Sequence, residues 1–415
     1  MKSKYIILRE GYDWLSVGNA YDELTLTEFN ALCMYLKNNI SSNVILYGYN
    51  KIKIINYVGI ISVGNLVIEI LPKISLTNDE VKDREMLIFM LSKCKKLSVD
   101  INEIIRTNVI NNTLLDILSK VYVDKLLKEL QKGLYFEYVS QENSLNKIKG
   151  KVMLTQNIKK NAMNKSRVYC KYDEFTENNM FNGILKKATD YLVGLVRDNR
   201  IRNEINIIRN ILGDVDDIFI SQDTLMNFKI NRKNERFKES FTLAKLILLN
   251  SSMDKSVGKD NGFSILFEMN YLYEEYIGIL IKEVLEDTII TVNTQEKSKY
   301  LLINAINNRN EVALKPDIVI YESHDAKVII DTKWKAAAIE NREVYSQSDI
   351  YQMYAYITTY QSCGKCILLY PKINKDYNHS VWKLNNNFDK RIFIKEISLE
   401  SYYKTKSELK LLLSN

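Results

Sequence analysis

Two strand-like segments joined by a polar turn constrain the fold of this chain more than any other feature. The segments cover residues 317–322 and 327–331, and the turn between them, residues 323–326, reads Ser-His-Asp-Ala. A hairpin folded about this turn places Asp317 roughly opposite Thr332. The second segment runs through Val-Ile-Ile directly into an acid, so the charged residue closes an apolar strand of the kind that sheets bury.

Three charged side chains converge in such a hairpin. Because side chains alternate along a strand, Asp331 and Lys333 share one face, within a cross-strand step of Asp317. Carboxylate oxygens bind Mg²⁺, and a neighbouring lysine can position the attacking water and offset charge that develops on a phosphate. A solvated strand face with alternating charge is the alternative interpretation. Pro316, at the position where the strand begins, favours the metal-binding interpretation.

A helical segment after the hairpin carries a second pattern. Within residues 346–360, Gln352 and Tyr356 are spaced i, i+4 and therefore share one face of the helix. The hairpin resembles the signature of PD-(D/E)xK nucleases in Pro316, Asp317, Asp331, Thr332 and Lys333. The Gln-x-x-x-Tyr spacing is similar to a motif of the RecB-like branch of that superfamily. The resemblance implies that Gln352 and Tyr356 brace the hairpin and contact the DNA backbone.

The nuclease resemblance also implies a metal site. Asp317 and Asp331 would bind Mg²⁺, for which Mn²⁺ can substitute, and the backbone carbonyl of Thr332 would be a third ligand. Lys333 would orient or deprotonate the attacking water and support the charge of the transition state.

A glutamate on the helix before the hairpin often completes the metal site in that superfamily. Here the helix is expected over residues 267–285, with Tyr-Glu-Glu-Tyr at its centre. Glu274 is the better match to the aromatic-Glu pair of the superfamily, and Glu275 is the second choice. For either residue, the alternative is an exposed glutamate on a solvated helix face.

The order of further blocks resembles McrC, the cleavage subunit of McrBC-type restriction systems, over about residues 55–360. The blocks before the hairpin are residues 56–61, 66–74, 143–151 and 172–178, and Asn182. The resemblance implies a phage-defence subunit that cuts double-stranded DNA only when joined to McrB, a hexameric AAA+ ring that hydrolyses GTP. McrC inserts into this ring and stimulates it. Two other interpretations stay open: a stand-alone RecB-like nuclease of repair or recombination, and a non-catalytic assembly subunit.

Charge and cysteine content are compatible with a nucleic-acid-binding protein of the cytoplasm. The net charge of +7 permits phosphate contacts without requiring them. An odd number of cysteines, the lack of a signal-like segment and the lack of a long apolar stretch predict a reducing compartment and no membrane span. Cys363 and Cys366 have a metal-like spacing but lack two further ligands, so we expect Cys366 in the core. No phosphate-binding Gly-x-x-x-x-Gly-Lys-[Ser/Thr] motif occurs, so energy for DNA translocation would come from another protein.

The patterning divides the chain into three regions of a mixed α+β fold. Residues 1–80 predict a β-rich lobe that docks the partner, and residues 81–255 a mainly helical region that contacts partner or DNA. Residues 256–415 predict an α/β nuclease domain of the restriction-endonuclease type. The polar segment 251–262 is the predicted boundary, followed by a helix over 264–286.

Overall fold

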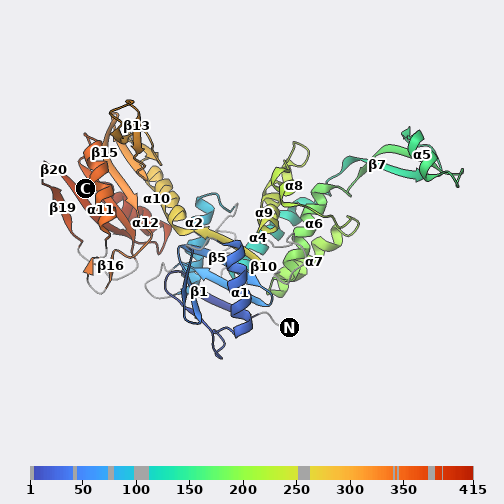
Figure 1. The fold of residues 1–415 in the computed structure, drawn as a ribbon, viewed down its shortest axis with the longest axis horizontal. Helices are drawn as coiled ribbons and strands as arrows, with labels where there is room; N and C mark the ends of the chain where they lie inside the picture. The colour runs from blue at the N-terminus through green and yellow to red at the C-terminus, as the bar shows by residue number, and fades with distance from the viewer. Residues whose placement is uncertain are drawn as a thin grey trace. The chain divides into compact units, whose positions relative to one another are not determined.

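The computed structural model is a mixed α/β fold in two compact units, which confirms the predicted fold class at that level (Figure 1). It describes residues 4–40, 44–72, 79–97, 112–250, 262–339, 342–343, 345–372, 379–385 and 387–414. One unit comprises Met1–Leu114 and Gly262–Asn415, and the other comprises Leu115–Asn261. The predicted boundary segment 251–262 lies outside the described residues except for its last residue. The predicted division into three functional regions stays a prediction.

The N-terminal part of the first unit contains two sheets. The larger has the order β1 (Lys4–Arg9), β6 (Leu66–Leu71), β5 (Tyr57–Val63) and β10 (Gly262–Glu268). The smaller has the order β2 (Leu15–Ser16), β4 (Lys51–Ile54) and β3 (Ile45–Gly48). Helix α1 (Leu26–Asn39) buries Leu32 and Leu36 in a core shared with Ile68. A tight turn joins β5 to β6, and Gly64 in it has a φ of 57°, which glycine adopts readily.

Strand β10 corrects the predicted start of the helix over residues 264–286. Residues Gly262–Glu268 pair antiparallel with β5, and helix α10 spans Met269–Leu285. Short apolar runs fit a strand or a buried helix equally well, and pairing with a strand far earlier in the sequence decides the matter here. Helix α10 therefore starts directly at the end of a strand of the N-terminal sheet.

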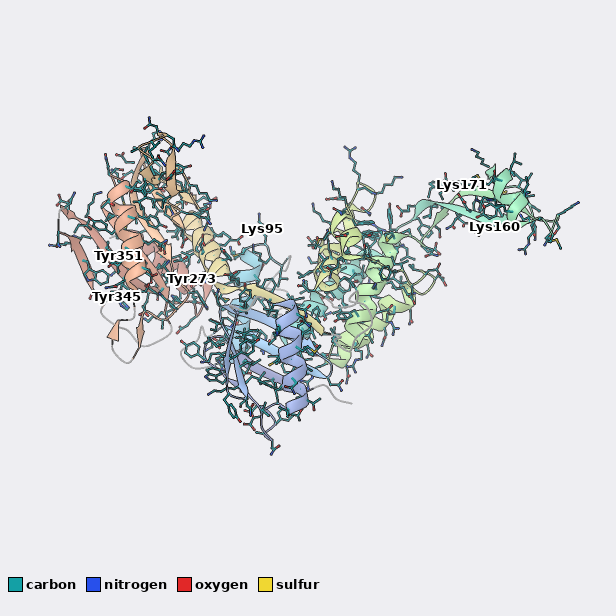
Figure 2. The ribbon with its side chains drawn as sticks, in the orientation of Figure 1. Lys95, Lys160, Lys171, Tyr273, Tyr345 and Tyr351 are labelled. Carbon is teal, nitrogen blue, oxygen red and sulfur yellow. The ribbon has the colours of Figure 1, made fainter. Side chains whose placement is uncertain are left out.

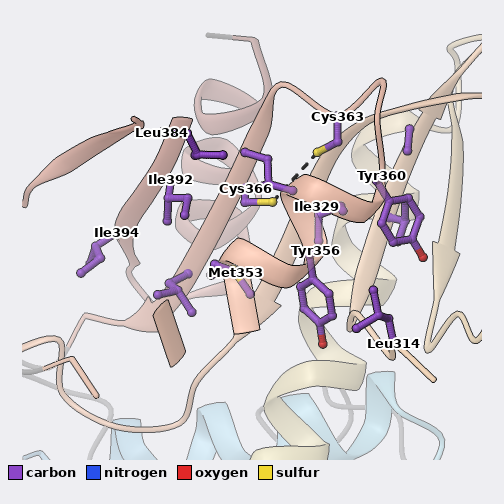
Figure 3. Close-up of a cluster of buried hydrophobic side chains, with 14 of the residues drawn as sticks. Leu314, Ile329, Met353, Tyr356, Tyr360, Cys363, Cys366, Leu384, Ile392 and Ile394 are labelled. Carbon is purple, nitrogen blue, oxygen red and sulfur yellow. Dashed lines mark hydrogen bonds between the residues drawn. The ribbon is translucent and has the colours of Figure 1, made fainter. Parts of the chain in front are cut away.

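The C-terminal part of the first unit is a six-stranded sheet flanked by helices. Its order is β11 (Thr291–Thr294), β14 (Ile318–Glu322), β15 (Asp325–Thr332), β18 (Lys365–Pro371), β20 (Asn387–Ile397) and β19 (Val381–Leu384). Strands β15, β18 and β20 are parallel. Helix α11 (Gln347–Thr359) packs Met353 and Tyr356 against Ile329 of β15 in a buried cluster (Figure 3).

Other elements complete the first unit. Helix α12 (Tyr402–Ser414) contacts α10 and β20, and α2 (Glu80–Lys93) contacts α10 and β6. Two small hairpins are formed by β12 (Tyr300–Ile303) with β13 (Asn310–Ala313), and by β16 (Ala338–Ile339) with β17 (Arg342–Glu343).

The hairpin of β14 and β15 differs from the prediction in its turn and register. Its turn consists of Ser323 and His324, both with positive φ, instead of the four residues predicted. A register shift after Ile320 follows, and the pairing of Ile318 with Ile330 places Asp317 across from Asp331, not Thr332. Tight hairpin turns with positive φ at both positions usually carry Asn and Gly, so Ser-His gave no signal for one. The correction brings the two acids closer in register than predicted.

The second unit combines helices with a strand hairpin that the sequence patterning missed. The helices are α4 (Leu114–Leu130), α5 (Leu154–Lys160), α6 (Met180–Val193), α7 (Asn199–Ile211), α8 (Gln222–Asn227) and α9 (Lys238–Leu249). Strands β7 (Glu137–Leu145), β9 (Val168–Thr176) and β8 (Lys151–Val152) form the hairpin, which carries Lys160 and Lys171 at its far end (Figures 1 and 2). Strand β7 is polar and largely unburied, so it lacks the apolar alternation by which strands are recognised. Among the described residues, no helix has both the length and the apolar character that crossing a membrane requires.

Candidate active site

The two acids of the hairpin lie at the end of β15 that is remote from the turn. Asp331 is two residues beyond Ile329 of the α11 core, so its side chain continues the row that faces α11. Asp317 directly precedes β14, and its Oδ2 accepts hydrogen bonds from Thr332 N at 2.7 Å and from Thr332 Oγ1 at 2.8 Å. The hairpin thus fixes the orientation of the Asp317 carboxylate.

The Asp331 carboxylate is almost completely buried, and Lys333 supplies its counter-charge. Its side chain is 1% exposed, and Lys333 Nζ lies 2.6 Å from Oδ2. Among the described residues, no group donates a hydrogen bond of normal geometry to either Asp331 oxygen. Burial, and then the charge of Asp317, raise the pKa of Asp331 to about 7. Burial also raises the pKa of Asp317. Two neighbouring carboxylates whose pKa values are raised by burial favour a bound cation.

A chain of hydrogen bonds connects the lysine to helix α11 and back to the hairpin. Lys333 Nζ donates to Gln352 Oε1 at 3.1 Å, and Gln352 Nε2 donates to the Tyr356 hydroxyl at 2.7 Å. The Tyr356 hydroxyl donates to the carbonyl of Lys315 at 3.0 Å. The i, i+4 spacing on α11 therefore brings both predicted side chains to the segment that carries Asp317.

The two candidate glutamates of α10 have different surroundings. Glu275 is exposed and forms an ion pair with Lys96 at 2.9 Å. Glu274 is half-buried, and burial followed by the charges of Asp317 and Asp331 raises its pKa to about 7. The charges of Asp317 and Asp331 thus act on Glu274, whereas Glu275 pairs with Lys96.

Two charged residues at this site were missed by the sequence patterning. Asp349 is buried, and its Oδ2 lies 2.6 Å from Lys335 Nζ, while its Oδ1 lies 4.0 Å from Lys333 Nζ. Burial opposes the ionisation of Asp349, but the hydrogen bond and charge of Lys335 and the charge of Lys333 together outweigh it, so the pKa is lowered. Ser346 caps α11 by accepting from Asp349 N. An acid at this helix position is so often part of a cap that its sequence context gave no separate signal.

The donor set suits a hard divalent cation. Within the described part of the chain, no three His, Cys, Asp or Glu side chains already stand together as a metal cage. The raised pKa values of Asp331 and Glu274 mean that protons occupy positions that a cation would take, because a bound metal displaces protons from its ligands. Carboxylate oxygens favour Mg²⁺ or Mn²⁺ over softer metals. The contacts described for Thr332 do not test the predicted role of its carbonyl as a metal ligand. That role stays a prediction.

The cysteine pair plays no part in this site. Cys363 and Cys366 are both fully buried in the α11 core, with their sulfur atoms 4.0 Å apart (Figure 3). The expectation that Cys366 is a core residue is confirmed.

An open pocket lies against helix α10, and the candidate metal ligand Glu274 is among the residues that line it. It has a volume of about 580 Å³ and is lined by Lys96, Tyr271, Glu274, Glu275, Gly278, Ile279, Lys282, Thr294 and Gln295. Lys282 Nζ donates to Thr294 Oγ1 at 3.4 Å, so its ammonium lies at the pocket wall. Glu274 is therefore reachable from solvent through a pocket with cationic side chains.

Comparison with known proteins places the chain in a family. The model of the family described as McrBC 5-methylcytosine restriction system component matches residues 52–371, which is more than half of the chain. Among solved structures, the chain is similar to one in the refined half-complex from the tetradecameric assembly of Thermococcus gammatolerans McrB AAA+ hexamers with bound McrC. The identity is 17%, the TM-score is 0.74, and 99% of each chain is covered.

A second solved structure, the cryo-EM structure of the Thermococcus gammatolerans McrBC complex, matches with a TM-score of 0.52 and 21% identity. It covers 68% of this chain and 88% of the other. No curated protein matches. The likeness to solved structures is one of fold, and the fold is that of an McrC-type subunit. The chain belongs to the McrBC 5-methylcytosine restriction system component family, which confirms the resemblance seen in its sequence.

Proposed function

We propose that this chain is the endonuclease subunit of a restriction system and hydrolyses DNA phosphodiesters with Mg²⁺. The observation that carries the proposal is the array of Asp317, Asp331 and Glu274 beside Lys333. Burial raises the pKa of all three acids, and the charge of Asp317 raises the pKa of Asp331 and Glu274 further. Groups with perturbed pKa values cluster at functional sites. The pattern resembles that of the PD-(D/E)xK nucleases.

In this mechanism the three carboxylates would hold the metal, with the Thr332 carbonyl as a further ligand. When bound, Mg²⁺ would polarise the phosphate and lower the pKa of a water molecule. Burial disfavours the charge on Lys333, but Asp331, Asp349 and Asp317 together outweigh burial and raise the pKa of this lysine above its usual value. Lys333 is therefore an ammonium at neutral pH. It would orient the attacking water and offset the charge on the phosphate instead of removing the proton.

We propose an AAA+ GTPase ring of the McrB type as the partner. The similar solved structure is described as McrB AAA+ hexamers with bound McrC, and the present chain has no phosphate-binding loop of its own. The hairpin of the second unit offers exposed apolar side chains that suit a protein contact, namely Ile148, Leu154, Ile158 and Met163. In the proposed assembly, the ring supplies nucleotide hydrolysis, whose rate this chain raises, and this chain supplies the cut.

Replacing Tyr356 with phenylalanine is expected to lower the DNA cleavage rate roughly ten- to hundred-fold, as loss of a supporting hydrogen-bond partner commonly does. The hydroxyl connects Gln352 to the carbonyl of Lys315, and without it Lys333 loses its brace. The ring stays in the α11 core, so the melting temperature should change little. Tyr354→Phe, on the exposed face of the same helix, is the matched control and should cut normally. Equal rates for the two variants would contradict the assigned role.

The test of the function combines the chain, Mg²⁺ and plasmid DNA with and without an McrB-type GTPase and GTP. Methylated and unmethylated plasmids run side by side, because the residues of this chain do not indicate which one is cut. Cleavage only with partner and GTP supports the proposal. Cleavage by the chain alone would make it a stand-alone nuclease. An assembled complex that hydrolyses GTP and leaves both plasmids intact would make the chain a non-catalytic assembly subunit.

A further inference from the structure

The residue after the catalytic lysine candidate binds the N-terminal part of the unit. Trp334 Nε1 donates to Glu10 Oε1 at 2.6 Å, although the two residues are 324 positions apart in the sequence. The Trp334 ring packs on Tyr273 of α10, with ring centroids 5.4 Å apart (Tyr273 is labelled in Figure 2). Glu10, at the end of β1, is only 7% exposed. A buried carboxylate thus holds the chain next to Lys333.

The other oxygen of Glu10 holds Asn56, which in turn caps helix α10. Asn56 N donates to Glu10 Oε2 at 2.7 Å. The Asn56 carbonyl accepts from Met269 N at 2.8 Å, and its Oδ1 accepts from Asn270 N at 3.0 Å. The first N–H groups of a helix lack partners within the helix. Within the described residues, the side chain of Glu268 at the helix start supplies no cap, so Asn56 fills this place.

Asn56 is suited to this position by its backbone. Its φ is 61°, a left-handed conformation that asparagine tolerates better than most residues. Its side-chain nitrogen also donates to Glu268 Oε1 at 3.2 Å. Three of its polar groups are therefore directed at the junction of β10 and α10, and a fourth contact reaches Glu10.

Glu10 and Asn56 therefore contact both parts of the chain that carry the candidate site. Helix α10 carries Glu274, and the strand end carries Asp331 and Lys333. We propose that Glu10 and Asn56 form a positioning centre that sets the placement of Glu274 relative to Asp331 and Lys333. The inference rests on the proposed function for the role of the three side chains.

A substitution that removes one hydrogen bond and keeps the packing tests this proposal. Trp334→Phe retains a ring against Tyr273 and loses the N–H that binds Glu10. Trp382→Phe is the matched control, because Trp382 is also half-buried and its ring packs on Tyr345 at 5.1 Å, away from Glu10. Asn56→Gly keeps the positive φ and the backbone contacts and removes the side-chain bonds to Asn270 N and Glu268. It is compared with Asn50→Gly, a turn residue with a φ of 51°.

Two readouts separate positioning from simple stability. The first is Mn²⁺ affinity by calorimetry, and the second is the kcat and KM for DNA cleavage by the full chain with its AAA+ partner and GTP. Trp334→Phe and Asn56→Gly should each weaken Mn²⁺ binding and kcat roughly ten- to hundred-fold, as loss of outer contacts to a metal site typically does. The KM for DNA should change little, and both controls should match wild type. The melting temperature should fall by no more than a few degrees, as loss of one hydrogen bond to a buried group does.

Mn²⁺ affinity and kcat equal to those of the controls would overturn the positioning role. If wild type binds Mn²⁺ and cuts no DNA, the proposed function fails. In that case, weaker Mn²⁺ binding by the two variants would still support the positioning centre, and unchanged binding would overturn it as well.

Discussion

Replacing Asp331 with asparagine is expected to stabilise the metal-free fold by on the order of 2–4 kcal/mol at pH 8. The side chain is 1% exposed, and burial followed by the charge of Asp317 raises its pKa from an ordinary 3.8 to about 7. Asparagine keeps the shape and removes the buried charge. A functional carboxylate whose charge is buried lowers the free energy of unfolding. The substitution should therefore raise it.

The pH dependence determines which of the two proteins, wild type or Asp331→Asn, is more stable. Below pH 3.8 the carboxyl is protonated in the folded and the unfolded chain, so its ionisation does not affect stability. Between 3.8 and about 7, mainly the unfolded chain ionises, so the wild-type fold loses stability as the pH rises. The advantage of Asp331→Asn should therefore be small at pH 4 and complete at pH 8, as measured by chemical unfolding at both values.

Metal should reverse the order of the two proteins. A cation that binds only the folded state stabilises it, so wild type should gain melting temperature with Mn²⁺ while Asp331→Asn should not. Asp325→Asn, an exposed acid of the same strand, is the control and should behave as wild type does. A variant that is less stable than wild type at pH 8, or that keeps the full response to Mn²⁺, would contradict the assignment of Asp331.

Replacing Arg84 with methionine should have the largest effect on the fold, a loss of about 3–5 kcal/mol of unfolding free energy. Arg84 Nε and Nη2 bind the two oxygens of Glu69 at 2.7 and 2.9 Å, and the side chains are 4% and 0% exposed. Glu69 also accepts from Leu114 N at 2.9 Å, so this pair connects α2, β6 and the backbone at Leu114. Without the arginine, a buried carboxylate loses its counter-charge.

Denaturant unfolding of the full chain measures this loss. Lys82→Met on the same helix is the control, because Lys82 is 59% exposed and lies 3.8 Å from Asp79. Exposed pairs contribute at most about 1 kcal/mol, so this variant should unfold near the wild-type midpoint. Replacing Glu69 with leucine together with Arg84→Met should recover much of the loss, since no charge is then left buried. An Arg84→Met midpoint equal to that of Lys82→Met would contradict the account.

Local patterns were enough to predict much of the candidate site. Strand alternation indicated that Asp331 and Lys333 share a face, and helical spacing indicated the same for Gln352 and Tyr356. All four lie together in the structure. These are relations between neighbours in the sequence, which the backbone geometry determines.

Relations that depend on distant segments could not be predicted in the same way. The register of the hairpin depends on a shift after Ile320, and residues 262–268 form a strand because β5 pairs with them. The Trp334–Glu10 contact joins residues 324 positions apart, and no pattern near either residue indicates it. The sequence around Asp349 is that of an ordinary acid at a helix start. Only the structure shows its contacts with Lys335 and Lys333.

The central claim is that Asp331 belongs to a Mg²⁺-dependent centre that cuts DNA. The most direct test follows the loss of supercoiled plasmid in the complete assembly of this chain, its AAA+ partner and GTP. Wild type should cut with Mg²⁺ and not with EDTA, and Asp331→Asn should form the same assembly and leave the plasmid intact. Cleavage by the Asp331→Asn assembly at the wild-type rate would contradict the account.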